Sequence, residues 1–131
     1  MKKVVVRTSS RMEMVDITDQ AKDYVRREQV VDGLLLVYVP HTTAGVTINE
    51  GADPAVQQDI SSFLKGLIPQ DSGFRHGEGN SDAHIKASLV GSSVSIIVEG
   101  GDLVLGAWQH IFFFEADGPR SRHVYFSHVS R

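Results

Sequence analysis

Histidine is the residue type in this sequence with the widest chemical range. Six histidines occur among 131 residues, and cysteine is absent. Without thiolates, a metal site must use imidazole nitrogens and oxygen atoms as ligands. Three of the histidines, His41, His76 and His84, stand at predicted strand ends or loop edges. Three such ligands suit a catalytic zinc site, which leaves one position for water or substrate. The alternative is that each imidazole binds a loop carbonyl or faces solvent.

Carboxylate and amide side chains follow two of these histidines. Asn49 and Glu50 come after His41, and Glu78 lies two positions after His76. A carboxylate near a metal or a substrate can act as a general acid or base. The segments that hold candidate metal ligands therefore also hold candidate proton-transfer groups.

Gln109 and Glu115 lie in a predicted strand dominated by aromatic residues, and strict alternation puts both side chains on one face of it. A carboxylate in such a strand is costly to bury unless it pairs with a cation, a metal-bound water or another donor. Glu115 is therefore a candidate functional residue. The alternative is a surface charge at the end of the strand.

Three cations are candidates for binding an anion. Arg120 and Arg122 follow a predicted turn, and Lys86 lies in a short predicted helix. Guanidinium and ammonium groups bind phosphate and carboxylate groups through charge-assisted hydrogen bonds. Taken alone, each of the three is also typical of a solvated surface charge.

The remaining histidines, His110, His123 and His128, fall inside predicted strands. His123 and His128 lie on opposite faces of the last strand because their separation is odd. Nothing in this spacing requires a shared site, and we expect structural roles for all three.

The elements of the first half follow from hydrophobic periodicity. A β-branched cluster near residue 4 and loose alternation over residues 12–17 predict two strands that form a hairpin. A helix is expected from about Thr18, because apolar residues then recur at spacings of three and four. Residues 34–39 are continuously apolar, which predicts a strand covered on both faces.

The second half begins with a helix, for which Asp53 is the expected N-cap and Pro54 the first helical residue. Its predicted buried stripe consists of Val56, Ile60, Phe63, Leu64 and Leu67. Residues 70–80 predict a loop of the kind that often carries function. A short helix ending at Gly91 and strands over residues 93–99, 103–115 and 121–129 complete the pattern. This order predicts an α+β fold.

Composition restricts the class of protein. The chain is 41% hydrophobic and 22% charged, with a formal net charge of −3. These values predict a single domain over residues 1–131 and argue against a protein that binds nucleic acid by neutralising many phosphates. The apolar stretch near the N-terminus is shorter than a signal peptide needs, and residues 34–39 are too few to cross a bilayer. We therefore expect a cytoplasmic protein with no membrane partner.

The motifs together resemble one family. The relevant segments are His41-Thr42-Thr43-Ala44, Ile48-Asn49-Glu50, Asp53-Pro54, His76-x-Glu78-Gly79-Asn80, Ala83-His84-Ile85-Lys86, Gly91, and Gly106-x-Trp108-Gln109 followed by Glu115. They are similar to those of the YjbQ-like family, whose members are often labelled secondary thiamine-phosphate synthase. The resemblance covers nearly the whole chain.

The resemblance implies an α+β fold with a mixed or antiparallel β-sheet sandwich and two or three helices, assembled as a homotrimer. It further implies a metal, zinc, held by His41, His76 and His84 in a cleft near the subunit boundary. Glu50, Glu78, Glu115 and Gln109 match polar family positions, which makes them candidates for supporting the ligands or for acid–base work. His110 receives no role from the resemblance.

Two kinds of function remain open at this point. The first is a metal-dependent enzyme, a thiamine-phosphate synthase or a metal-assisted hydrolase, that acts on an anionic small molecule bound by Asn49, Lys86, Arg120 and Arg122. Synthesis from a diphosphate would call for a hard cation such as magnesium. The second is a non-catalytic trimeric metal-binding module. A metal closed by four protein ligands would favour the module, and an open coordination position would favour the enzyme.

Overall fold

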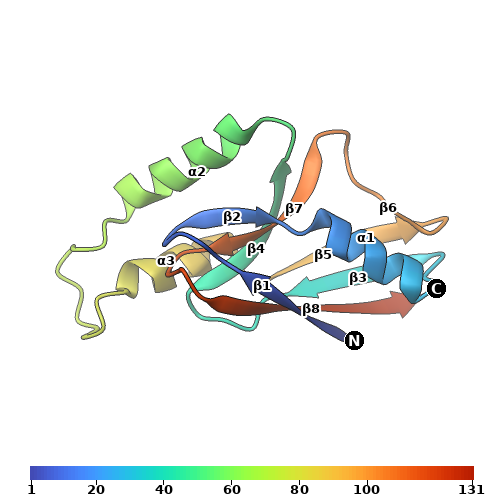
Figure 1. The fold of residues 1–131 in the computed structure, drawn as a ribbon, viewed down its shortest axis with the longest axis horizontal. Helices are drawn as coiled ribbons and strands as arrows, with labels where there is room; N and C mark the ends of the chain where they lie inside the picture. Colours follow the sequence, from blue (N-terminus) through green and yellow to red (C-terminus); the bar gives the residue numbers. More distant parts are fainter.

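The computed structural model describes residues 1–131 and contains eight strands and three helices (Figure 1). In chain order these are β1 (Lys2–Arg7), β2 (Glu13–Asp16), α1 (Thr18–Arg27), β3 (Gly33–Tyr38), β4 (Ala44–Glu50), α2 (Pro54–Leu67), α3 (Ser81–Val90), β5 (Ser93–Glu99), β6 (Asp102–Leu103), β7 (Gln109–Glu115) and β8 (Ser121–Ser130). No helix among them is long and apolar enough to cross a membrane.

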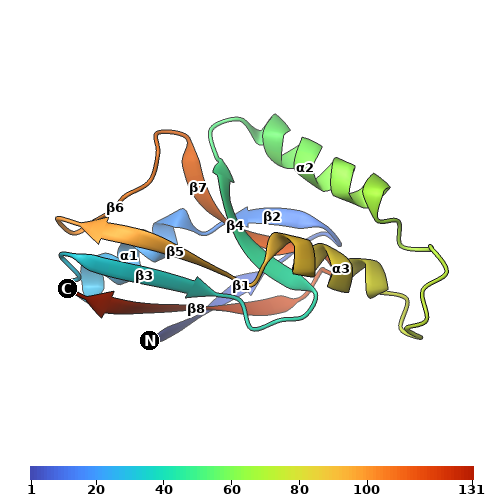
Figure 2. The ribbon, with the colours of Figure 1, turned by 180° about the vertical axis from the view of Figure 1, so that it is seen from behind.

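The strands form two antiparallel sheets, which makes the fold α+β as predicted. The larger sheet has the strand order β1-β8-β3-β5-β6, and the smaller has the order β2-β7-β4. Every pairing in both sheets is antiparallel. The three helices lie in the connections between strands. Helix α1 lies over the inner side of the larger sheet, and α2 and α3 lie near the smaller one (Figures 1 and 2).

The chain changes sheets at two places where the sequence predicted continuity. The hairpin expected near the N-terminus is wrong, because β1 pairs with β8 and β2 pairs with β7. The strand expected over residues 103–115 is divided, since β6 pairs with β5 in the larger sheet whereas β7 belongs to the smaller one. Propensity indicates that a segment is extended, but the partner of a strand is set by tertiary packing.

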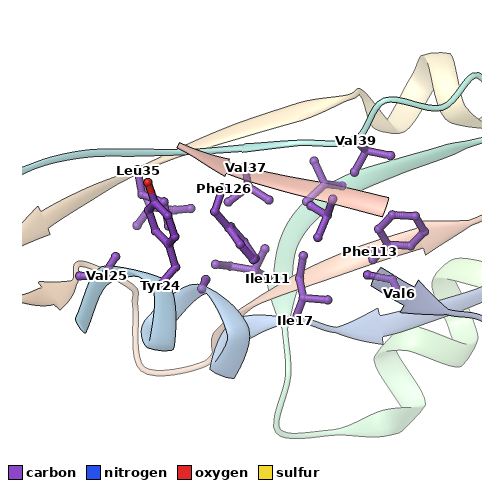
Figure 3. Packing of buried hydrophobic residues seen from close by; sticks show 14 of the residues in the cluster. Val6, Ile17, Tyr24, Val25, Leu35, Val37, Val39, Ile111, Phe113 and Phe126 are labelled. Atoms are coloured by element: carbon purple, nitrogen blue, oxygen red, sulfur yellow. The ribbon is translucent and has the colours of Figure 1, made fainter. Parts of the chain in front are cut away.

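A hydrophobic core lies between the two sheets and α1 (Figure 3). Leu35 and Phe126 enter it from the larger sheet, Ile111 and Phe113 from the smaller one, and Tyr24 from α1. All five side chains are almost completely removed from water. Burying each such side chain contributes on the order of 2 kcal/mol, so this layer stabilises the contact between the sheets.

The outer face of the larger sheet is open and apolar. Along β3, Leu35 and Val37 are buried, whereas Leu34, Leu36 and Tyr38 are 44%, 40% and 43% exposed. The prediction that this strand is covered on both faces is therefore not met within one chain. The continuous apolar run reflects alternation between a buried core face and an exposed apolar face.

Helix α2 begins as predicted but does not bury the predicted stripe. The Asp53 side chain accepts a hydrogen bond from the Ala55 backbone N–H at 3.0 Å, and Pro54 is the first helical residue. No residue of α2 is fully buried, and Phe63 is 68% exposed. Leu64 alone of the predicted stripe packs against a small second core around Phe114. The helix lies at the periphery of the molecule (Figure 2). The prediction that this stripe is buried is therefore wrong for the single chain.

Candidate functional site

A hollow of about 490 Å³ brings together two of the three predicted metal ligands. His41 lines it from the segment before β4, and His84 lines it from α3. Their relative position depends on the close contact between α3 and β4. A Cβ atom added to Gly45 would lie 2.4 Å from the Gly91 carbonyl oxygen, and that oxygen accepts the Val46 N–H at 3.0 Å. Only glycine at position 45 allows the end of α3 to approach β4 so closely.

His41 is held by two neighbouring aromatic rings and by the backbone. Its Nε2 accepts a hydrogen bond from the His123 N–H at 3.0 Å, and the two rings stack at 6.3 Å between centroids. Phe113 meets the His41 ring edge-on. Burial lowers the pKa of His41, and the positive charge of Arg122 lowers it further. The imidazole is therefore neutral near pH 7, and because Nε2 accepts, the proton lies on Nδ1, which can donate to another partner.

The third predicted ligand lies beside His84 rather than His41. The His76 ring is perpendicular to the His84 ring at 5.4 Å between centroids, and its Nε2 lies 3.7 Å from the Glu78 carboxylate. Both His76 and Glu78 are exposed in the loop between α2 and α3. No three histidine or carboxylate side chains of one chain are gathered closely enough to hold a metal ion. The imidazole nitrogens suit zinc as ligands. One chain, however, places His76 beside His84, while His41 lines the hollow separately.

Glu115 and Arg122 form a buried ion pair next to this hollow. The Arg122 Nε donates to Glu115 at 2.8 Å, a second Arg122 nitrogen contacts the same carboxylate, and the Thr8 hydroxyl donates to it at 2.7 Å. Burial acts to raise the pKa of Glu115, but hydrogen bonds from Arg122 and Thr8 outweigh it and lower the pKa below its ordinary value. Arg122 also donates to the Thr43 hydroxyl at 2.9 Å. The pair thus fastens β7, β8 and the segment before β4 to one another.

A second buried cluster contains Lys86 and two residues that the sequence reasoning missed. Asp82 and Lys86 lie one turn apart on α3, fully buried, with 2.6 Å between Nζ and the carboxylate. Arg11 binds both oxygens of Asp82 at 3.0 Å. Burial raises the pKa of Asp82, but the two cations outweigh it and hold the pKa at about 2. The four-residue spacing of Asp82 and Lys86 was a usable signal, whereas nothing local indicated Arg11.

Arg120 differs from the other two predicted anion-binding cations because its side chain is half exposed. It donates to the Asp117 carboxylate at 3.1 Å, and Asn80 donates its amide N–H to the same carboxylate at 2.9 Å. The Asn80 amide oxygen is buried without a hydrogen-bond partner in the chain. A buried acceptor of this kind is available to a donor that the single chain does not supply.

Asn49, Glu50 and Gln109 lie at the other end of the smaller sheet. Glu50 faces Gln109 across the β4–β7 pairing, while Ala44 faces Glu115. Six residues of strand span about 20 Å, so these groups and the histidine hollow are well separated within one chain. Each also has a local partner: the Glu50 carboxylate accepts the Ala52 N–H at 2.5 Å, and the Gln109 amide oxygen accepts the Gly106 N–H at 2.8 Å. Asn49 accepts the Glu50 N–H at 2.7 Å.

Two histidines expected to have structural roles each contact one polar side chain. His110, at the same end as Glu50, lies with Nδ1 2.5 Å from the Asp16 carboxylate. His128 lies with Nδ1 2.6 Å from the Tyr24 hydroxyl. Asp16 was missed by the sequence reasoning, because its partner is 94 positions away.

These observations define a small α+β protein with two antiparallel sheets and a histidine-lined hollow beside a buried ion pair. The family model described as UPF0047 protein YjbQ-like matches residues 2–131. The chain belongs to the YjbQ/UPF0047 family, which confirms the resemblance seen in the motifs.

Relatives from archaea and bacteria share the whole domain. UPF0047 protein MJ1081 of Methanocaldococcus jannaschii is 54% identical over 123 residues, which cover 94% of this chain and 89% of that protein. UPF0047 protein YugU of Bacillus subtilis is 45% identical over 126 residues, covering 95% and 96%. The crystal structure of a conserved YjbQ/UPF0047 protein from Clostridium acetobutylicum matches with a TM-score of 0.97 at 48% identity, covering 98% of this chain and 100% of that one.

Proposed function

We propose that the protein is a zinc-binding homotrimeric enzyme that acts on an anionic small molecule. The observation that carries this proposal is the placement of His84, whose ring packs against His76 and lines one hollow with His41. Secondary thiamine-phosphate synthase is the named activity that the family resemblance suggests, and magnesium would assist if the substrate is a diphosphate.

The donor set supports zinc in its chemistry. His41, His76 and His84 are imidazoles, and a metal binds the neutral form, which burial favours at His41. Metal binding at His41 would replace the hydrogen bond from the His123 N–H to Nε2, because the other nitrogen of the neutral ring carries the proton. One chain does not gather three such ligands, so the proposal requires the rest of the metal site to come from a neighbouring subunit. When bound, zinc would supply Lewis-acid chemistry to a substrate oxygen or to water.

The open sheet face supports association of several copies. Leu34, Leu36 and Tyr38 of β3 continue into Ile97 of β5 and Val129 of β8, and all are at least 40% exposed. A contiguous apolar face of this kind is unfavourable in water and is typical of a subunit interface.

The predicted acid–base residues differ in how free they are to act. Glu78 is exposed and lies beside His76, which favours it as a proton-transfer group at the metal. Glu50, Asn49 and Gln109 would reach the hollow from a neighbouring subunit. Glu115 and Arg122 are bound to each other, and their position next to the segment of His41 supports a positioning role.

A non-catalytic metal-binding module is the second candidate function. It is favoured by the engagement of Glu115 and Arg122 with each other, because groups already paired are less available to a substrate. Such a module would close the metal with four protein ligands, whereas the enzyme would leave one position to water.

Elemental analysis tests the metal site. Wild-type protein purified without added metal is expected to contain about one zinc ion per chain, and His84→Ala is expected to lose it. His128→Ala is the matched control, because His128 lies in the larger sheet, where its partner is the Tyr24 hydroxyl. Wild-type protein without zinc, or His84→Ala with full zinc, would overturn the proposal. Zinc X-ray absorption then separates the enzyme, with three protein ligands and water, from the module with four.

A further inference from the structure

A second hollow, of about 510 Å³, lies between α2, α3 and the connection from β1 to β2. In both ribbon views this connection lies between the two helices (Figures 1 and 2). The volume is in the range of small-molecule sites. Most of the residues that line it have hydrogen-bonding side chains, among them Arg11, Ser61, Ser62, Lys65, Gln70 and Lys86.

Lys86 forms part of the wall of this hollow with an ammonium group that is incompletely paired. The side chain is almost completely buried, and its Nζ has one partner in the chain, the Asp82 carboxylate at 2.6 Å. An ammonium group carries three N–H donors. Two donors of a buried cation are therefore left to a ligand or to water in the hollow, and leaving a buried charge underpaired is unfavourable.

The charge around the hollow is also positive in excess. Arg11, Lys65 and Lys86 line it, and Asp82 is the one carboxylate that binds two of them. Asp117 lies 3.9 Å from Arg11 but is closer to Arg120, at 3.1 Å. Asp71 is exposed in the loop after α2, and Glu13 accepts hydrogen bonds from the Ser9 N–H and hydroxyl; neither carboxylate lines the hollow. An anion in the hollow would balance this charge.

The second hollow is separate from the histidine hollow. The two have no lining residue in common. His84 and Lys86 are two positions apart on α3, so their side chains leave the helix on different faces. Binding at the second hollow therefore does not depend on the zinc site proposed above.

We propose that this second hollow binds the phosphate group of a small molecule. Arg11, Lys65 and Lys86 would contact the phosphate oxygens, and the hydroxyls of Ser61 and Ser62 would donate further hydrogen bonds. A phosphate group accepts many hydrogen bonds at once, which matches a wall of mixed cations and hydroxyls better than a single carboxylate would. The volume leaves room for an organic part attached to the phosphate.

Isothermal titration calorimetry on the full chain tests the site, with inorganic phosphate and glycerol 3-phosphate as probes. Lys65→Glu is expected to raise the dissociation constant by about tenfold or more, because it replaces an ammonium donor with a carboxylate that repels the phosphate. The control Lys3→Glu makes the same charge change on β1, away from the hollow, and is expected to bind as wild type does. Tighter binding of glycerol 3-phosphate identifies a phosphate ester, and equal or weaker binding identifies free phosphate.

Two further variants keep the result interpretable. Ser62→Ala removes a hydroxyl from the exposed surface of α2 without changing the charge, and is expected to weaken binding to a smaller extent. His84→Ala is expected to keep phosphate binding even where it loses zinc, which separates this site from the proposed function. No binding of either probe by wild type, equal binding by Lys65→Glu, or loss of binding in His84→Ala would overturn the proposal.

Discussion

Each of the four buried charged residues has a partner of opposite sign. Lys86 pairs with Asp82 on the same helix, and Arg122 on β8 pairs with Glu115 at the end of β7. Such pairs contribute little net stability compared with apolar residues of the same shape, but removing one partner leaves an uncompensated charge in the interior. Their effect in this protein is to fix which segments meet at the two hollows.

The Glu115 pair leads to a prediction about stability. Glu115→Gln is expected to lower the free energy of unfolding at neutral pH by about 3 kcal/mol, because Arg122 remains buried without its carboxylate. The exposed Glu99→Gln is the control and is expected to have little effect. Both values come from urea unfolding followed by circular dichroism.

The same variants have an expected pH dependence. The pKa of Glu115 is lower in the folded state than its ordinary value of 4.5, so the unfolded state binds more protons in acid. The stability from Glu115 is present above pH 4.5 and is lost as the pH falls through the folded-state pKa. The difference in the free energy of unfolding between wild type and Glu115→Gln should therefore shrink in acid. A difference that stays constant with pH would contradict this account.

At the level of elements, the contact of α3 with β4 positions His84 relative to His41. The end of α3 comes to the smaller sheet because Gly91 accepts the Val46 N–H, and Gly45 leaves room for that approach. The geometry of the histidine hollow is thus a consequence of backbone packing. The helix itself has no strong amphipathic pattern that would indicate which face it buries.

A pair of glycine substitutions tests this contact. In Gly45→Ala the new Cβ would lie 2.4 Å from the Gly91 carbonyl oxygen, so α3 must shift and the stability should fall by about 1–3 kcal/mol. In Gly66→Ala on α2 the new methyl group meets no atom within 4 Å. Because alanine is the better helix former, the free energy of unfolding should rise by about 0.5–1 kcal/mol. Thermal unfolding measures both changes, and equal effects of the two substitutions would contradict the explanation.

At the level of the whole molecule, one sheet face and one helix expose apolar side chains that a single chain does not cover. The face of β3 with Leu36 and Tyr38 is one example, and Phe63 on α2 is another. A folded monomer that exposes so much apolar surface is expected to associate with other copies. The proposed subunit boundary accounts for the sheet face, whereas the exposed Phe63 lies on a different element, α2.

Light scattering tests the assembly. Wild-type protein is expected to have three times the mass of one chain, and Leu36→Lys is expected to reduce it, because the new ammonium group would be desolvated at the interface. Lys22→Glu, on the exposed side of α1, changes the charge away from this face and should leave the mass unchanged. A monomeric wild type, or a trimeric Leu36→Lys, would exclude this face as the interface.

Much of the secondary structure could be predicted because its signals are local. Asp53 and Pro54 mark the start of α2, Gly91 marks the end of α3, and alternation marks β5 and β8. The histidine motif could be recognised for the same reason, since short spacings are visible in the chain. What could not be predicted is which distant segments pair, as the wrong N-terminal hairpin shows.

The sequence by itself determined the α+β class, most element boundaries and the family, because these depend on local propensity and on short motifs. Only the tertiary structure decided that Arg11 meets Asp82, that Asn49 and Glu50 lie about 20 Å from the histidine hollow, and that no residue of the predicted stripe of α2 is fully buried. The physical reason is that burial and charge pairing depend on contacts between residues far apart in the chain. A carboxylate, a cation or an apolar side chain acquires its role from the segment that packs against it.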